Sequence, residues 1–130
     1  MPHISIDYSG NLEEALDIAA LCAQMRETAA GVEAFGVPGL RVRAHRADHW
    51  AVADGAPGNA YIDVAVRIRE GRPAEVKEDA ARRLYAALEA FTADYAAAHP
   101  LAISLELREI DAVLGFRGGS IRAHLGEAAE

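Results

Sequence analysis

The sequence of 130 residues has a single cysteine and no apolar run approaching the ~20 residues that span a bilayer. Cys22 can form no disulfide within the chain, which fits a protein of the reducing cytoplasm. No charged N-terminal region precedes an apolar stretch, so we expect no signal peptide. The formal net charge of -7 argues against a nucleic-acid surface, because phosphate contacts need clustered cations. We therefore expect a cytoplasmic protein with neither nucleic acid nor a membrane as partner.

The sequence contains two rounds of one pattern, in which an alternating stretch, a helical stretch and a second alternating stretch follow one another. Alternation of apolar and polar residues is typical of half-buried strands. We expect four strands, at about residues 3–8, 40–45, 61–69 and 103–108. The loop ADGAPGN separates two halves, about 1–58 and 59–130, of a single domain that spans 1–130.

Each half is expected to carry one helix between its strands. Asn11 followed by Glu14 looks like a capping pair, which predicts a first helix over about residues 11–30. Pro73 suits the first turn of a second helix. The apolar stripe of this helix comprises Val76, Ala80, Leu84, Leu88, Phe91 and Tyr95. The tail, residues 113–125, is broken by glycines and predicts only a short strand or turns.

Both helices are long enough to cross over between parallel strands, which predicts an α+β fold with two helices on one face of a four-stranded sheet. The uncovered face would carry Arg41, Arg43, Asp63, Arg67, Glu106 and Arg108. One interpretation is a solvated face. We favour an oligomer interface with paired charges, since two-layer sheets commonly cover their second face by association.

The proline directly after the start methionine is the first candidate for chemistry. Met before Pro is readily removed in cells, and Pro2 would then carry a free secondary amine. An α-amino group titrates near ~8, and a proline amine is more basic still. Burial or nearby cations would favour the uncharged form that can act as a base. The structural alternative is an ordinary proline at a strand start.

Arginines gather in the middle of this acidic chain and indicate a small anionic ligand. They are Arg41, Arg43, Arg46, Arg67, Arg69 and Arg72. Parallel pairing of the first two strands would bring Arg41 near Pro2. Arg72 precedes a helix at the end of a strand, a position suited to binding a carboxylate. The alternative for both arginines is a structural ion pair.

Other motifs do not support a site. His45, Asp48 and His49 have partial metal-ligand spacing, but they fall on a strand that runs into a loop, and no third ligand is evident. We therefore expect no metal. FGVPG and RGGS lack the strand-to-helix setting of a phosphate loop, and Ser9 and Ser104 lack the context of a nucleophile elbow.

Four segments together resemble the 5-carboxymethyl-2-hydroxymuconate Δ-isomerase family of the tautomerase superfamily. They are Met-Pro-His at the start, RVRAHRADHWAVADG at 41–55, EGRP at 70–73 and GFRGGSIRAHL near the end. The resemblance covers nearly the whole chain. It implies a homotrimer without a cofactor, with Pro2 as catalytic base and Arg41 and Arg72 as carboxylate-binding residues. Ile4 and Arg46 depart from the aromatic residues common at these positions.

The reaction that the resemblance implies is a 1,3-keto–enol tautomerisation of a small unsaturated polycarboxylate from aromatic catabolism. Two alternatives keep the fold: a tautomerase for another enol acid such as phenylenolpyruvate, and a trimeric ligand-binding relative without turnover. A third is a ferredoxin-like binding module that dimerises through its open sheet face.

Overall fold

The computed structural model describes residues 2–125. Within them the strands are β1 (His3–Ser9), β2 (Arg41–Ala47), β3 (Ala60–Arg69) and β4 (Leu101–Ile110). The α-helices are α1 (Ile18–Ala30), α2 (Ala74–Ala98) and α3 (Ile121–Leu125), and short 3-10 turns lie at η1 (Gly10–Leu12) and η2 (Val37–Gly39). The four predicted strands are thus confirmed, each with bounds that differ slightly from the expectation.

The strands form one mixed sheet in the order β2-β1-β3-β4. β1 pairs parallel with β2, and β3 pairs parallel with β4, as two β-α-β crossovers require. The two halves meet where β1 pairs antiparallel with β3. This central pairing places the beginning of β1 beside the end of β3, and it decides which side chains of the two halves become neighbours.

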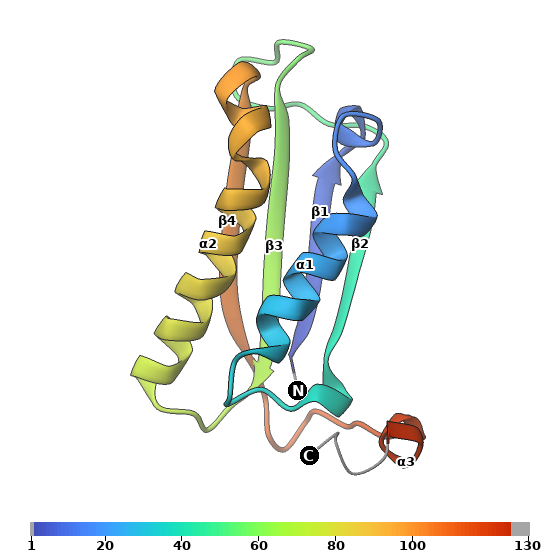
Figure 1. Ribbon diagram of the computed structural model, residues 1–130, viewed down its shortest axis with the longest axis vertical. Helices are drawn as coiled ribbons and strands as arrows, with labels where there is room; N and C mark the ends of the chain where they lie inside the picture. Colours follow the sequence, from blue (N-terminus) through green and yellow to red (C-terminus); the bar gives the residue numbers. More distant parts are fainter. Residues whose placement is uncertain (1, 126–130) are drawn as a thin grey trace.

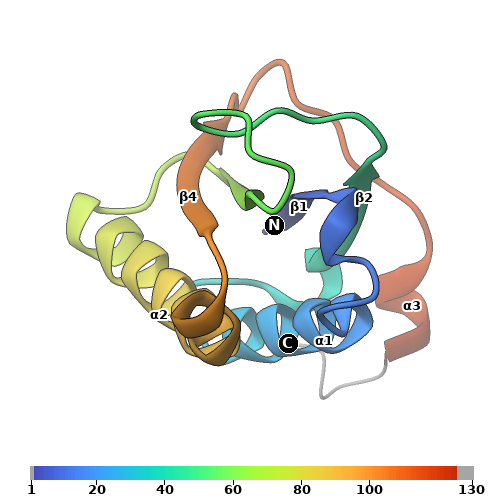
Figure 2. The same cartoon turned by 90° about the horizontal axis from the view of Figure 1, so that it is seen from above.

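Helices α1 and α2 lie side by side on one face of the sheet (Figures 1 and 2). The apolar half of each alternating strand faces them, so Ile4 and Ile6 of β1 and Val64 and Val66 of β3 are fully buried. The stripe predicted for α2 supplies Ala80, Leu84 and Leu88 to this core. The other sheet face carries the polar half of each strand, including the six charged residues expected there. The predicted two-layer α+β architecture is confirmed.

The first helix does not begin at Asn11 as its sequence predicts. Residues 10–12 form a 3-10 turn, and α1 starts at Ile18 behind Asp17, whose side chain accepts a hydrogen bond from Ala20 N at 3.0 Å. The Asn11 amide instead donates to Asn59 O across the loop, at 3.0 Å. A tertiary contact therefore uses the side chain that would have capped the helix.

The other helical expectations also need small corrections. Pro73 is the residue that precedes α2, one position before its first turn. The tail contains a short helix, α3, where only a strand or turns were predicted. The segment between β4 and α3 runs below the sheet end at which β1 begins (Figure 1). In residues 2–125, no helix has the length and apolar character needed to cross a membrane.

Candidate functional site

A row of basic side chains crosses the open sheet face at the beginning of β1. His3 pairs with Arg41 of β2 on one side and with Arg67 of β3 on the other. Arg67 in turn pairs with Arg108 of β4. Because alternate residues of a strand face the same side, all four side chains stand on the face away from the helices. The register thus places His3 between two guanidinium groups.

Pro2 is the residue directly before this row. It is buried, and its carbonyl oxygen accepts a hydrogen bond from Arg41 N at 3.2 Å. The parallel pairing of β1 with β2 therefore brings Arg41 beside the chain start, as predicted. Burial and nearby arginines are the two conditions under which an amine at this position would favour its neutral form.

The imidazole of His3 is held in one orientation. Arg67 Nη2 lies 3.2 Å from His3 Nδ1, and an arginine can only donate, so Nδ1 is the acceptor. Burial lowers the pKa of His3 below 6.5, and the charges of Arg41, Arg67 and Arg43 lower it further. The ring is therefore neutral near pH 7 and carries its proton on Nε2. This atom is buried and has no hydrogen-bond partner among residues 2–125.

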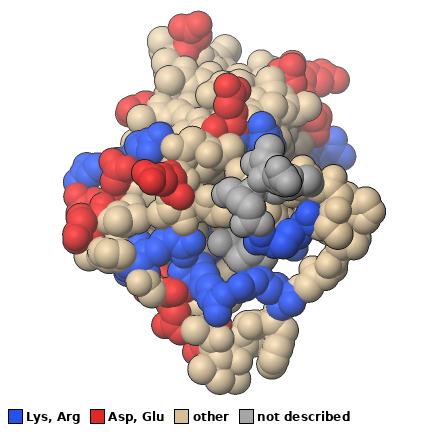
Figure 3. All heavy atoms as spheres, turned by 60° about the horizontal axis from the view of Figure 1, so that its bottom comes forward, with Lys and Arg blue, Asp and Glu red and all other residues tan. Residues whose placement is uncertain are grey.

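The arginines of the molecule differ in whether an acidic side chain pairs with them. Arg46, Arg82, Arg83 and Arg108 each form an ion pair with an acidic side chain. Among the described residues, no ion pair is formed by Arg41, Arg43, Arg67, Arg69 or Arg117. Figure 3 shows basic side chains gathered over this end of the molecule. An acidic protein thus keeps unneutralised positive charge at one place.

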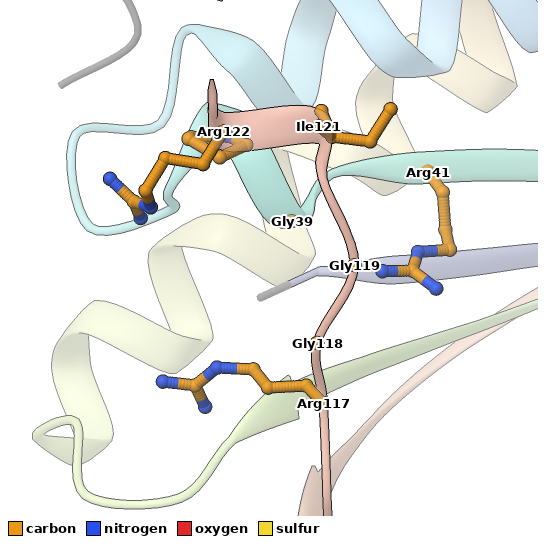
Figure 4. A pocket seen from close by; sticks show the side chains of 8 residues that line it. Gly39, Arg41, Arg117, Gly118, Gly119, Ile121 and Arg122 are labelled. Carbon is orange, nitrogen blue, oxygen red and sulfur yellow. The ribbon is translucent and has the colours of Figure 1, made fainter. Parts of the chain in front are cut away.

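The tail makes two pockets against this end of the sheet. The Arg41 pocket lies between η2 and the tail, and its lining includes Arg41, Arg117, Gly119 and Arg122. Figure 4 shows the Gly118–Gly119 segment passing between the Arg41 side chain and those of Arg117 and Arg122. Gly119 has a φ of 110°, a backbone conformation that residues with a Cβ rarely adopt.

The second pocket, called the His3 pocket below, lies on the other side of Arg117. It is lined by His3, Arg67, Arg69, Ile110, Asp111, Ala112, Gly115, Phe116 and Arg117. Its basic residues come from β1, β3 and the tail, and its apolar wall comes from the tail and the end of β4. Arg117 is common to both pockets.

Arg72 lies in a different setting from Arg41. Its Nε and Nη2 donate to Ala34 O at 3.0 and 2.7 Å, and its Nη1 donates to Arg69 O at 2.8 Å. The guanidinium carbon is 5.9 Å from the centre of the Phe35 ring. Three of the five N–H donors of an arginine are therefore directed to backbone carbonyls. Arg72 lines neither of the two pockets, so the structure does not bring it together with Arg41 there.

No cluster of three or more His, Cys, Asp or Glu side chains that could hold a metal ion occurs in residues 2–125. His45 faces the open side of the sheet on β2, and Asp48 is engaged by the Nε of Arg46 at 3.1 Å. The acidic side chain of that sequence pattern is thus in an ion pair with a neighbouring arginine.

Sequence reasoning did not single out His3, Arg67, Arg69 or Arg117 as site residues. Arg67 and Arg69 were noticed only as members of a charged group, because their neighbours depend on the antiparallel pairing of β1 with β3. The signal for Arg117 was present in the segment GFRGGSIRAHL, where an arginine stands beside two glycines near the end of the chain.

Comparison with known proteins gives a consistent result. The family profile described as 5-carboxymethyl-2-hydroxymuconate isomerase matches residues 2–125. A 5-carboxymethyl-2-hydroxymuconate Delta-isomerase of Escherichia coli is 30% identical over 123 residues, which are 95% of this chain and 98% of that protein. A crystal structure of a 5-carboxymethyl-2-hydroxymuconate delta-isomerase has a TM-score of 0.89 at 26% identity, covering 95% of this chain and 92% of the other. The isomerase from Deinococcus radiodurans R1 has a TM-score of 0.87 at 30% identity, with the same coverage of 95% and 92%.

Proposed function

Because the chain belongs to the 5-carboxymethyl-2-hydroxymuconate isomerase family, we propose that it tautomerises 5-carboxymethyl-2-hydroxymuconate or a close unsaturated polycarboxylate. One observation carries the proposal beyond family membership. Pro2 is buried at the start of β1, and the next residue lies between Arg41 and Arg67. A free amine there would be partly desolvated and surrounded by cations, and both effects favour a neutral base.

In the proposed reaction, the neutral amine of Pro2 takes the proton of the dienol hydroxyl. The O–H bond breaks, its electron pair forms the carbonyl, and the conjugated double bonds shift along the carbon chain. The proton is then delivered from Pro2 to a carbon further along, where a C–H bond forms. No proton or electron is gained or lost overall, so the reaction needs no cofactor.

Arg41 and Arg72 are proposed to bind the substrate carboxylates and to stabilise the negative charge of the dienolate. Arg41 lines a pocket, and its backbone N–H donates to Pro2 O, which supports this role. Arg72 has two N–H donors beyond those that its backbone carbonyls occupy, which is enough for one carboxylate. In this proposal Arg72 therefore binds a substrate carboxylate and also holds the loop at Ala34.

We also propose that the protein acts as a cytoplasmic homotrimer with a small anionic substrate. The open sheet face supports association, because it is uncovered by helices and carries charges of both signs. The tail adds exposed apolar side chains, with Val113, Leu114 and Phe116 being 77%, 76% and 93% exposed. Large exposed apolar groups are typical of interfaces between chains. Light scattering of the purified protein measures the subunit number, and a stable monomer or dimer would contradict this assembly.

The most direct test of the proposed base is to block the nitrogen of Pro2 and then to free it. The protein is made with a removable N-terminal extension, and its mass is measured before and after cleavage exposes Pro2. Isomerisation of 5-carboxymethyl-2-hydroxymuconate is followed by ultraviolet absorbance. We expect activity only after cleavage, because an amide nitrogen cannot accept the proton.

A substitution provides the second arm of this test. Pro2→Ala replaces the ring amine by a flexible primary amine and should lower kcat by at least about 10-fold, while the assembly stays intact. Equal activity of the blocked and cleaved proteins would remove Pro2 from the mechanism. Absence of turnover after confirmed cleavage would overturn this substrate for the protein.

A further inference from the structure

We propose that the His3 pocket is a second anion subsite, in which Arg117, Arg67 and Arg69 bind a substrate carboxylate that Arg41 does not hold. The inference rests on the proposed function and adds to it a specificity-determining residue, Arg117 of the tail. The ligand that fits is a carboxylate attached to a short unsaturated carbon chain, such as the carboxymethyl arm of the proposed substrate.

The charge of the pocket favours an anion. Arg67, Arg69 and Arg117 bring three positive charges to its lining, and none forms an ion pair among the described residues. Asp111 is the acidic residue in this lining, but its Oδ1 accepts hydrogen bonds from Val113 N at 2.8 Å and Leu114 N at 2.7 Å. The carboxylate of Asp111 thus holds its own turn, and the pocket keeps an excess of positive charge.

The hydrogen-bonding state of His3 leaves one buried donor at this end of the sheet without an acceptor. Because Nδ1 accepts from Arg67, the neutral ring has its N–H at Nε2, which is buried and has no partner within residues 2–125. A buried donor without an acceptor is unfavourable, because it has lost its hydrogen bond to water. A carboxylate is an acceptor-only group, so it suits the three guanidinium groups of the lining.

The apolar part of the pocket fits the carbon chain of the ligand. Ile110 and Phe116 line it beside the arginines. A site with apolar walls and a few cationic groups binds a conjugated acid better than a free inorganic anion. The pocket is therefore matched to both chemical parts of an unsaturated carboxylic acid.

The position of Arg117 connects this subsite to the proposed catalytic centre. It lines the Arg41 pocket as well as the His3 pocket, and His3 directly follows Pro2 in the chain. A substrate with several carboxylates can thus place one at Arg41 and another in the His3 pocket, at the sheet end where β1 begins. A monocarboxylate would leave one of the two cationic pockets without a counter-charge.

The test compares two substrates that differ by one arm. These are 5-carboxymethyl-2-hydroxymuconate and 2-hydroxymuconate, which lacks the carboxymethyl group. Arg117→Gln should lower kcat/KM for the first by about 10-fold or more, mainly through KM, and for the second by a clearly smaller factor, because Arg117 also lines the Arg41 pocket. Arg82→Gln removes the same charge from the exposed side of α2, where Arg82 pairs with Glu78, and should change neither value. Arg117→Lys should restore part of the loss because it keeps the charge without the planar fork.

A binding measurement separates this inference from the proposed function. Calorimetry with the unreactive probe propane-1,2,3-tricarboxylate should show affinity for the unmodified protein that falls at least 10-fold in Arg117→Gln but not in Arg82→Gln. If the protein has no isomerase activity yet shows this loss, the proposed function fails and the subsite stands. If activity is present but Arg117→Gln has the same kcat/KM for both substrates and the same affinity for the probe as the unmodified protein, the subsite is overturned. Equal losses of kcat/KM for both substrates would also overturn it, because Arg117 would then not distinguish a substrate with the carboxymethyl group from one without it.

Discussion

Replacement of Arg72 by alanine tests how the loop after α1 is fixed to the end of β3. The change removes three hydrogen bonds to backbone carbonyls, two to Ala34 O at 3.0 and 2.7 Å and one to Arg69 O at 2.8 Å. It also removes the contact with the Phe35 ring. The bonds at Ala34 are only partly buried, so Ala34 O is expected to recover some hydrogen bonding from water.

The expected loss follows from these contacts. A hydrogen bond from a charged donor contributes roughly 1.5–3 kcal/mol when well buried. Here one of the three bonds is exposed and all share a single guanidinium, so solvent screening reduces the sum to about 2 kcal/mol. For a chain of this size, about 4 °C of Tm corresponds to each kcal/mol, so we expect a Tm about 8 °C lower.

The assay is thermal unfolding followed by circular dichroism at one fixed protein concentration, because association between subunits raises apparent stability. Arg72→Lys keeps the charge but loses the planar guanidinium group. Its Tm should lie between those of the unmodified protein and Arg72→Ala. Arg83→Ala is the control, since Arg83 makes one exposed hydrogen bond to a loop carbonyl, Gly31 O at 3.2 Å, and should cost below about 1 kcal/mol. An Arg72→Ala protein with the Tm of the unmodified chain would refute the reasoning.

Three further predictions concern other parts of the structure. Asp17→Ala should lower the free energy of unfolding by about 1 kcal/mol, measured in urea, because Ala20 N loses its cap at the start of α1; no change would show that the cap is dispensable. Gly10→Ala should cost about 1–3 kcal/mol in the same assay, since its Cβ would lie 2.8 Å from Ala47 O; unchanged stability would mean that the backbone yields freely. The folded-state pKa of His3 lies below 6.5, so the unfolded chain takes up a proton first as the pH falls. Unfolding measured from pH 7.5 to 5 should therefore show His3→Gln gaining stability relative to the unmodified protein towards pH 5, and parallel curves would contradict a lowered pKa.

Local pattern was sufficient wherever a side chain's environment depends on its own segment. Strict alternation in 61–69 predicts β3 because one face of that strand must be buried, and Ile62 and Val64 are fully buried while Asp63 is exposed. The apolar stripe likewise predicts α2. The parallel pairing of β1 with β2, and with it the position of Arg41 beside Pro2, follows from the length of the crossover between them.

The start of the first helix shows where local pattern fails. Asn11 with Glu14 has the form of a capping pair, yet Asn11 donates to Asn59 O, which is 48 residues away, and Asp17 caps α1 instead. A side-chain amide donates its hydrogen bond to whichever backbone carbonyl the fold brings near. The sequence around the amide does not indicate which carbonyl that is. The tail helix α3 was missed for a related reason, since its glycines indicate turns and five residues are too few for a clear period.

The sequence by itself determined the four strands, the long helix and the family, and it made Pro2, Arg41 and Arg72 candidates for the site. Only the tertiary structure decided what surrounds them. Antiparallel pairing of β1 with β3 sets Arg67 against His3, and the tail brings Arg117 to the same end of the sheet. Arg72, by contrast, is directed to the carbonyls of Ala34 and Arg69. The physical reason is that hydrophobic periodicity is a property of neighbours along the chain, whereas charge clusters and hydrogen-bond partners are properties of neighbours in space.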